Sequence, residues 1–335
     1  MQKKVLTTWG QFDLSKSHML CQGTKGFAIT ERLRELACLT GQSEVYGQAS
    51  ELLDRIGGIK LCGMQIKRLC THYGSLVDPL VNSNCEAVIP ELPQPAAEQK
   101  VYVMVDGAML SLRPDEWREV KLGRVFTDDT IVQLSPSRRE VQRSVYVSHL
   151  GSVDDFFPKL ERHLVNYPHK VIVGDGAKWI WNWAEDNYPG AVQILDFYHA
   201  KEKLVEFARY QWKEETKRLN WTNEQLQALR NNGAMLVRQC VKACRARNEP
   251  AKEAKEKLLR YYLEHEDRMQ YKTYREQGLL IGSGPIEAAH RGVLQQRMKR
   301  SGQKWSQQGA QAMANLRCYH ASKAWNIIQH IIKVA

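Results

Sequence analysis

The chain has 335 residues, 43% of them apolar, which is enough for one large domain or two ordinary ones with a sizeable core. It carries 48 Lys and Arg against 37 Asp and Glu, and the formal net charge of +11 favours an anionic partner, most often nucleic acid. The sequence shows no signal peptide and no apolar run of about 20 residues, so we expect a soluble, cytoplasmic protein without a membrane partner. The eight cysteines form no C-x-x-C pair, which favours reduced structural thiols over a zinc site.

The N-terminal third is predicted to be mainly helical. Residues 1–28 show few periodic apolar positions and are expected to form an arm. Residues 29–85 carry apolar positions at helical spacing in three successive segments, and Gly57-Gly58 separates the last two. This pattern fits a helix-turn-helix-like DNA-binding domain and fits a generic three-helix bundle equally well. In the first case Gln65, Lys67 and Arg68 would lie on the exposed face of the third helix and contact DNA.

A linker and a mixed α/β region follow. Residues 86–100 contain three prolines and little periodicity, as is typical of a semi-rigid linker. Beyond it the pattern predicts, in chain order, strands at 101–106, 117–126 and 144–150, a helix at 154–164, a strand at 170–175, a helix at 179–187 and a strand at 191–197. This is the element order of an RNase H-like mixed sheet. The predicted catalytic domain spans residues 101–335 and includes a helical insertion over about 200–280, because so long a charged segment cannot be a loop.

Two acidic residues follow predicted buried strands. Asp106 ends the strand VYVMVD and precedes Gly107, while Asp175 ends KVIVGD and precedes Gly176. Ligands of open α/β folds bind at such strand ends, and two carboxylates that converge there repel each other unless a cation bridges them. Oxygen ligands without Cys or His favour Mg²⁺ or Mn²⁺. Taken singly, however, each Asp-Gly pair also fits an ordinary turn.

A third acid lies in a basic C-terminal segment. Glu287 follows Gly284-Pro285, which can open a helix, so its carboxylate would lie near the positive helix end, where an acid also stabilises the helix. From Gly284 onward eight basic residues accompany this single acid, a charge of 8 − 1 = +7. We expect this segment to contact DNA phosphates, although a solvated basic face without a specific role fits too. The residues expected to form this contact are Arg291, Arg297, Lys299, Arg300 and Lys304, with Trp305 offering a flat face to a flipped base.

Three long segments carry a family resemblance. Residues 103–126, 171–204 and 280–317 resemble the catalytic blocks of bacterial insertion-sequence DDE transposases of the Kra-type family, which is similar to the Mutator-like transposases. The resemblance spans roughly residues 29–325 with the blocks in the same order. It implies an RNase H-like fold and an active-site triad of Asp106, Asp175 and Glu287. The gap of 69 residues between the first two acids, and of 112 to the third, resembles that of members with a helical insertion.

The resemblance also implies an activity. Two Mg²⁺ or Mn²⁺ ions held by the triad would support cleavage of double-stranded DNA at the element ends and transfer of the freed 3′-hydroxyl to target DNA. Joining two ends requires a homodimer or higher oligomer on DNA. The resemblance also implies a bacterial protein associated with the nucleoid. Asp196 and His199 resemble the D-x-x-H pair of Mutator-like enzymes. They are expected to be accessory, although His199 fits a buried hydrogen-bonding histidine equally well.

The sequence departs from the resembling family in one respect, and two other functions also fit it. Relatives often carry a Cys-rich, zinc-ribbon-like segment before the helical region, whereas only Cys21 is present here, so we expect a chain that begins late. The alternative functions are a catalytically silent DNA-binding protein derived from a transposase, and an RNase H-like nuclease without strand transfer. Tyr102 and Tyr198 lie near the blocks, but a tyrosine recombinase needs Arg and His partners in a different fold.

Overall fold

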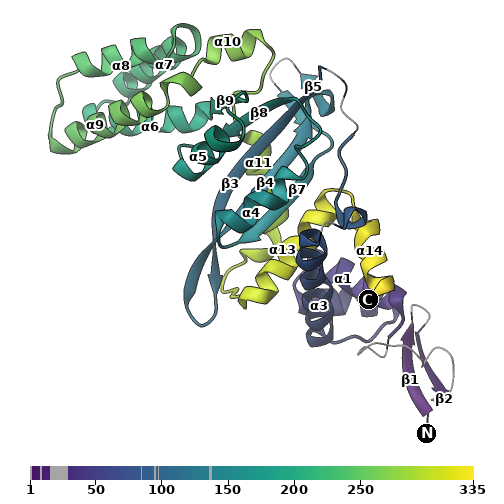
Figure 1. The fold of residues 1–335 in the computed structure, drawn as a ribbon. Helices are drawn as coiled ribbons and strands as arrows, with labels where there is room; N and C mark the ends of the chain where they lie inside the picture. Colours follow the sequence, from purple (N-terminus) through teal and green to yellow (C-terminus); the bar gives the residue numbers. More distant parts are fainter. Residues whose placement is uncertain are drawn as a thin grey trace. The chain divides into compact units, whose positions relative to one another are not determined.

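The computed structural model describes residues 2–7, 10–15, 29–83, 85–93, 96, 98–135 and 138–335. The chain divides into two compact units. Figure 1 shows their helices and strands, coloured along the sequence. The first combines residues 1–94, 107–166 and 288–335, and the second combines residues 95–106 and 167–287. The first division falls between Gln94 and Pro95, inside the predicted linker.

The N-terminal segment contains a β-hairpin. Strand β1 (Gln2–Thr7) pairs antiparallel with β2 (Gly10–Ser15). The predicted arm thus contains two strands that the sequence pattern did not reveal, because a short two-stranded ribbon leaves little apolar periodicity in the sequence. Cys21, on which the departure from the resembling family rests, lies outside the described residues.

The three predicted helices are present as α1 (Glu31–Ser43), α2 (Tyr46–Gly57) and α3 (Gly63–Asn82). The Thr30 side chain accepts a hydrogen bond from the Leu33 amide and caps α1. Helix α2 ends at Gly58, whose φ of 63° suits a residue without a side chain. Helix α1 packs on α14 (Trp325–Val334), and α3 packs on α13 (Gln307–Ala321), so C-terminal helices complete the core of this region.

The first unit also contains a sandwich of helices around two strands. Strands β4 (Glu116–Thr127) and β7 (Val145–Leu150) pair antiparallel, with Gly123 opposite Val147 and Leu122 opposite Ser148. A side chain at Gly123 would meet Leu160 of α4 (Val153–Glu161), whereas Ser148 bonds to Cys318 of α13. Because opposed residues share a face and adjacent residues alternate, α4 and α13 cover opposite faces of β4 and β7.

Several short elements lie outside the predicted set. Strands β5 (Ile131–Ser135) and β6 (Arg138–Val141) form an additional hairpin, which the sequence pattern did not reveal. The remaining short elements are the 3₁₀ helices η2 (Glu86–Val88), η3 (Asp128–Thr130) and η4 (Glu266–Arg268).

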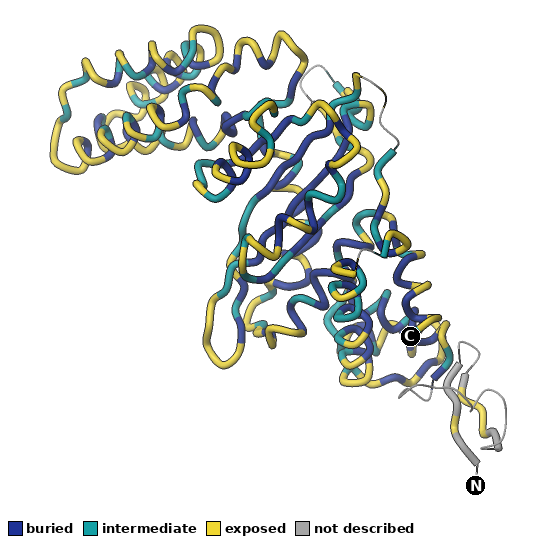
Figure 2. Tube along the Cα trace, in the orientation of Figure 1, coloured by how far each residue is buried: buried dark blue, intermediate teal, exposed yellow. Residues whose placement is uncertain are grey.

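The second unit is built on parallel strands. The first part of β3 (Lys100–Leu112) pairs parallel with β8 (His169–Gly174), which pairs parallel with β9 (Val192–Leu195). Helix α5 (Lys178–Asn187) links β8 to β9. In the described chain these strands belong to a five-stranded sheet of order β7-β4-β3-β8-β9, so the prediction of a mixed α/β fold is confirmed. Strand β3 is the central strand of the five, and the run of buried residues in β3 and β8 is coloured dark blue in Figure 2.

The predicted helical insertion follows β9 directly. It consists of α6 (Phe197–Gln211), α7 (Glu215–Asn232), α8 (Ala234–Ala243), α9 (Glu249–Glu264) and α10 (Tyr271–Glu276). Helix α6 packs on both α7 and α9. Phe207, Trp212 and Trp221 form an aromatic cluster whose ring centroids lie 4.9–6.0 Å apart. A helix that buries aromatic residues on one side and exposes charges on the other explains the composition of this segment.

The helix predicted after Gly284 is interrupted by a wider turn. It begins as α11 (Gly284–Ala289), continues as the π-helix η5 (His290–Gln295) and ends as α12 (Gln296–Met298). A π-helical turn changes which residues face inward, so a constant helical period places the later side chains incorrectly. None of the described helices is both long and apolar enough to cross a lipid bilayer.

Candidate active site at the ends of the parallel strands

The register of the parallel strands places three acidic residues side by side. Met104 lies opposite Val173, and Asp106 and Asp175 each come two residues later. Gly174 lies opposite Leu195, and Asp175 and Asp196 each come one residue later. Strand β3 itself continues to Leu112, so the prediction that Asp106 ends its strand was wrong. Since neighbouring strands are about 4.8 Å apart, the parallel pairing still places the three residues side by side at the edge where that pairing ends. Open α/β folds bind ligands at this edge.

Asp175 is held by its own turn and by the helix that follows. Its carboxylate accepts a hydrogen bond from the Ala177 amide at 2.9 Å, and its carbonyl accepts one from the Trp181 indole at 2.8 Å. The next residue, Gly176, lies against Tyr261 of α9. The Asp-Gly pair is therefore more than a turn, because Gly176 allows the helical insertion to pack closely against this edge.

The pKa of the Tyr261 hydroxyl reflects the negative charges gathered at this site. Burial raises the pKa of its hydroxyl, and the charges of Asp175, Asp196 and Glu202 raise the pKa further. The sequence did not indicate this residue, because Tyr261 lies 86 residues after Asp175 and no local pattern connects the two. Its position in a helix rich in Lys and Glu carried no usable signal.

Asp196 is fully buried, with 0% of its surface exposed. It precedes α6, and its carboxylate accepts hydrogen bonds from the amides of Tyr198 and, at 3.2 Å, His199. Its second carboxylate oxygen accepts a hydrogen bond from the Ser283 amide at 2.6 Å. A buried charge is stable only when such donors surround it. Asp196 therefore connects β9 to the segment that precedes Glu287.

Glu287 is exposed in the first turns of α11. Its carboxylate accepts a hydrogen bond from the Ser283 hydroxyl at 3.1 Å, and its amide donates to the Ser283 carbonyl at 3.1 Å. The predicted position near the beginning of a helix is thus confirmed. Through Ser283, Glu287 is linked to Asp196.

The chemistry of these carboxylates fits a hard divalent cation. Asp106 and Asp175 are half-buried and Glu287 is exposed, so all three offer oxygen atoms that a hydrated Mg²⁺ or Mn²⁺ could reach. Within the described residues, however, no three His, Cys, Asp or Glu side chains are gathered closely enough to hold a metal ion. The structure thus aligns Asp106 with Asp175 and tethers Glu287, without forming a closed set of ligands.

His199 lies one turn into α6 and is half-exposed. Its Nδ1 atom lies 3.6 Å from the Glu202 carboxylate. A half-exposed ring beside an acid differs from the buried hydrogen-bonding histidine that was one of the two expectations.

The residues predicted to contact DNA from α3 lie on its first turns, with Gln65 and Arg68 exposed and Lys67 half-exposed. Gln65 has a structural role in addition, because its side-chain oxygen accepts a hydrogen bond from the Cys62 amide at 3.1 Å and caps α3. A side chain engaged in capping has less freedom to contact a base edge. Lys67 and Arg68 form no ion pair with any residue that the structure describes.

Two predicted DNA-contacting residues are buried, and that expectation was wrong for both. Arg297 has 0% of its surface exposed and Trp305 only 5%. The Arg297 guanidinium lies between the rings of Tyr46, at 4.7 Å, and Trp305, at 5.2 Å, and donates to the Gly41 carbonyl at 3.0 Å. Cation–π stacking replaces the lost hydration, so this arginine is part of the core of the first unit.

The other basic residues of the segment fall into two groups. Arg300 pairs with Glu44 at 3.1 Å, and Lys304 pairs with Asp115. Arg291 and Lys299 are exposed and form no ion pair with the residues described here. The cations available to an external phosphate are therefore fewer than the sequence predicts.

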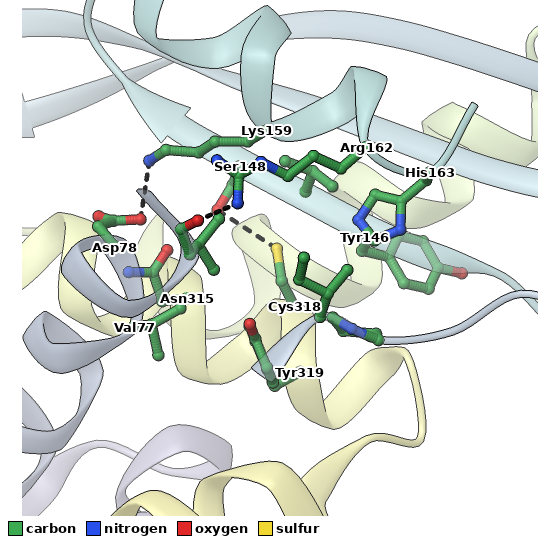
Figure 3. A pocket seen from close by; sticks show the side chains of 14 residues that line it. Val77, Asp78, Tyr146, Ser148, Lys159, Arg162, His163, Asn315, Cys318 and Tyr319 are labelled. Atoms are coloured by element: carbon green, nitrogen blue, oxygen red, sulfur yellow. Dashed lines mark hydrogen bonds and ion pairs between the residues drawn. The ribbon is translucent and has the colours of Figure 1, made fainter. Parts of the chain in front are cut away.

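A small hollow lies in the first unit, and the elements that line it carry none of the aligned acidic residues (Figure 3). It measures about 40 Å³, enough for one or two water molecules, and is lined by residues of α3, β7, α4 and α13. Lys159 reaches across it to Asp78 at 2.7 Å, and the Cys318 thiol donates to Ser148 at 3.3 Å. The hollow thus lies where two helices pack on a strand and is crossed by an ion pair.

Residues 31–325 match the uncharacterised protein family UPF0236. The chain belongs to this family. The match spans both compact units and includes all the acidic residues aligned or tethered at the sheet edge. No curated protein is significantly similar to the chain.

Proposed function

We propose that this protein of family UPF0236 is a DDE-type DNA transposase that cleaves DNA at the ends of an insertion element and transfers the 3′-hydroxyl to target DNA. The observation that carries the proposal is the alignment of Asp106 with Asp175 on adjacent parallel strands, together with the hydrogen-bonded tether of Glu287. The third acid comes from a helix far along the chain, as the resemblance implies.

The sheet supports this proposal. In the order β7-β4-β3-β8-β9, strand β3 lies in the centre, with β4 and β7 on one side and β8 and β9 on the other. An RNase H-like core has this arrangement, and its first strand carries the first catalytic acid. Asp106 occupies that position on β3. The helical insertion after β9 agrees with the wide gap before Glu287.

Asp106, Asp175 and Glu287 would hold two Mg²⁺ or Mn²⁺ ions. When bound, such ions supply the positive charge that activates water and stabilises the leaving oxygen in phosphoryl transfer. The protein's own part is to fix the carboxylates. The Ala177 amide and the Trp181 indole hold the turn at Asp175, and Ser283 holds the Glu287 side chain.

Double-stranded DNA is the proposed partner, both as element end and as target. The net charge of +11 supports it, as do Lys67, Arg68, Arg291 and Lys299, cations without an ion-pair partner among the described residues. Two ends must be joined in one reaction, so we propose that at least two copies of the chain assemble on DNA.

The proposal is tested by incubating the protein with DNA that carries its own element ends and Mg²⁺, and separating the strands on a denaturing gel. We expect cleavage at the ends and products that are joined to target DNA. Asp106→Asn, Asp175→Asn and Glu287→Gln should each abolish both products while DNA affinity stays within about twofold. Cleavage without joining would indicate a nuclease instead. Binding with neither product would indicate a silent DNA-binding protein.

A further inference from the structure

The carboxylate of Asp196 has more partners than a helix cap requires. Two of its hydrogen bonds come from the amides of Tyr198 and His199, which any good capping residue would satisfy. The third comes from the amide of Ser283, which lies 87 residues away in the chain. This bond joins the start of the helical insertion to its end.

The segment Leu280–Ser283 is tied at further points. The Leu280 amide donates to the Tyr102 hydroxyl at 3.4 Å, and Tyr102 lies four residues before Asp106 on β3. The Ile281 carbonyl accepts from the Phe197 amide at 2.9 Å. A Cβ atom at Gly282 would lie 2.9 Å from the Tyr198 ring, so glycine allows the close approach. The segment is therefore fixed to both β3 and α6.

Ser283 transmits this fixed position to Glu287. Its carbonyl accepts from the amides of Ile286, at 2.8 Å, and Glu287, at 3.1 Å, which sets the first turn of α11. Its hydroxyl donates to the Glu287 carboxylate at 3.1 Å. The side chain of Glu287 is thereby restrained although it is exposed.

We infer that Asp196 is a positioning residue that orients Glu287 through Ser283, and that it is not itself a metal ligand. The inference rests on the proposed function insofar as Glu287 is a metal ligand. Its geometric part, the hold of Asp196 on the Ser283 segment, stands independently. The carboxylate of Asp196 is fully buried and already accepts hydrogen bonds through both oxygens. Outer partners of this kind typically change metal affinity or activity 10–100-fold when they are removed.

The experiment uses the full chain and three variants. Asp196→Ser keeps a good capping hydroxyl for α6 but is too short to reach Ser283. Ser283→Ala removes the hydroxyl that bonds to Glu287, and Ser283→Thr restores one. The matched control is Asn248→Ser at the start of α9, where the side chain caps the Ala251 amide and has no link to Glu287.

The first measurement is hydrogen–deuterium exchange of the peptide over residues 279–287, without DNA or metal. Asp196→Ser should speed its exchange at least about tenfold, and Asn248→Ser should not. Unchanged exchange in Asp196→Ser overturns the inference whether or not the protein is a transposase. If Asp196→Ser does not fold, the Ser283 pair in the second measurement decides.

The second measurement is the Mg²⁺ concentration that gives half-maximal DNA cleavage. It should rise about 10–100-fold in Asp196→Ser and Ser283→Ala, and return towards the wild-type value in Ser283→Thr. A wild-type Mg²⁺ requirement in Ser283→Ala, alongside an inactive Glu287→Gln, overturns the inference and leaves the proposed function intact. Absence of cleavage by the wild type overturns the proposed function, and the exchange measurement then decides the geometric part.

Discussion

Tyr261 occupies the space into which a side chain at Gly176 would project. A Cβ atom at Gly176 would lie 2.3 Å from Cε2 of Tyr261, far inside van der Waals contact. The insertion therefore packs directly on the turn that carries Asp175.

We predict that Gly176→Ala destabilises the protein by about 1–3 kcal/mol, because overpacking forces the ring or the turn to move. Chemical denaturation measures this free energy of unfolding. Gly190→Ala is the control, since no atom lies within 4 Å of a Cβ there. Combining Gly176→Ala with Tyr261→Leu should recover part of the loss. Equal stability of Gly176→Ala and wild type would contradict the packing argument.

Arg297 is predicted to support folding rather than DNA binding. Arg297→Ala should lower the free energy of unfolding by about 2–4 kcal/mol, because it removes the group between Tyr46 and Trp305 and leaves the Gly41 carbonyl without its donor. Arg297→Lys should recover little, since an ammonium group does not stack as a planar guanidinium does. The slope of log DNA affinity against log salt should stay unchanged in any variant that folds.

Arg291 and Lys299 are predicted to support DNA binding rather than folding. Replacing both with alanine should leave the free energy of unfolding within about 0.5 kcal/mol of the wild type, as is usual for exposed residues. The salt slope of DNA binding should decrease by about one unit for each phosphate that is no longer neutralised, and affinity should fall similarly for all sequences. A Lys304→Ala variant gives a comparison, because Lys304 is already paired with Asp115. An unchanged salt slope in the double variant would show that Arg291 and Lys299 contact solvent and not DNA phosphates.

Stability is predicted to fall in mild acid because of His163. Burial, together with the charge of Arg162, lowers the pKa of this imidazole from 6.5 to about 4. The unfolded chain therefore takes up this proton first. The contribution is fully present above about pH 6.5, decreases as the pH falls, and is lost near pH 4, with a total of about 3 kcal/mol at most.

The measurement is the free energy of unfolding between pH 7 and pH 4, for the wild type and for His163→Gln. The difference between the two should shrink in acid, where the wild type loses the stability that depends on a neutral ring. His330→Gln is the control, because this histidine is exposed at the C-terminal helix. Parallel pH profiles for wild type and His163→Gln would show that the ring is not buried in solution.

The sequence by itself determined the main helices and strands and the positions of two acids along them. Buried strands appear as apolar runs, so KVIVGD placed Asp175 at a strand end without tertiary information, whereas the strand that contains VYVMVD continues past Asp106 to Leu112. Helical periodicity likewise located α1–α3 and the insertion. These features are local, because each depends on neighbouring residues and on the period of its own element.

Only the tertiary structure decided which side chains meet. Arg297 looks like any surface arginine until Tyr46 and Trp305 enclose it, and the π-helical turn before it shifts its direction inward. From the sequence Asp196 is expected only to be accessory, and the tertiary structure adds that the Ser283 amide, 87 residues away, donates a hydrogen bond to its carboxylate. Such contacts join residues far apart in the chain, and the free energy of burying and pairing them depends on the packing of the whole unit, which no local pattern records.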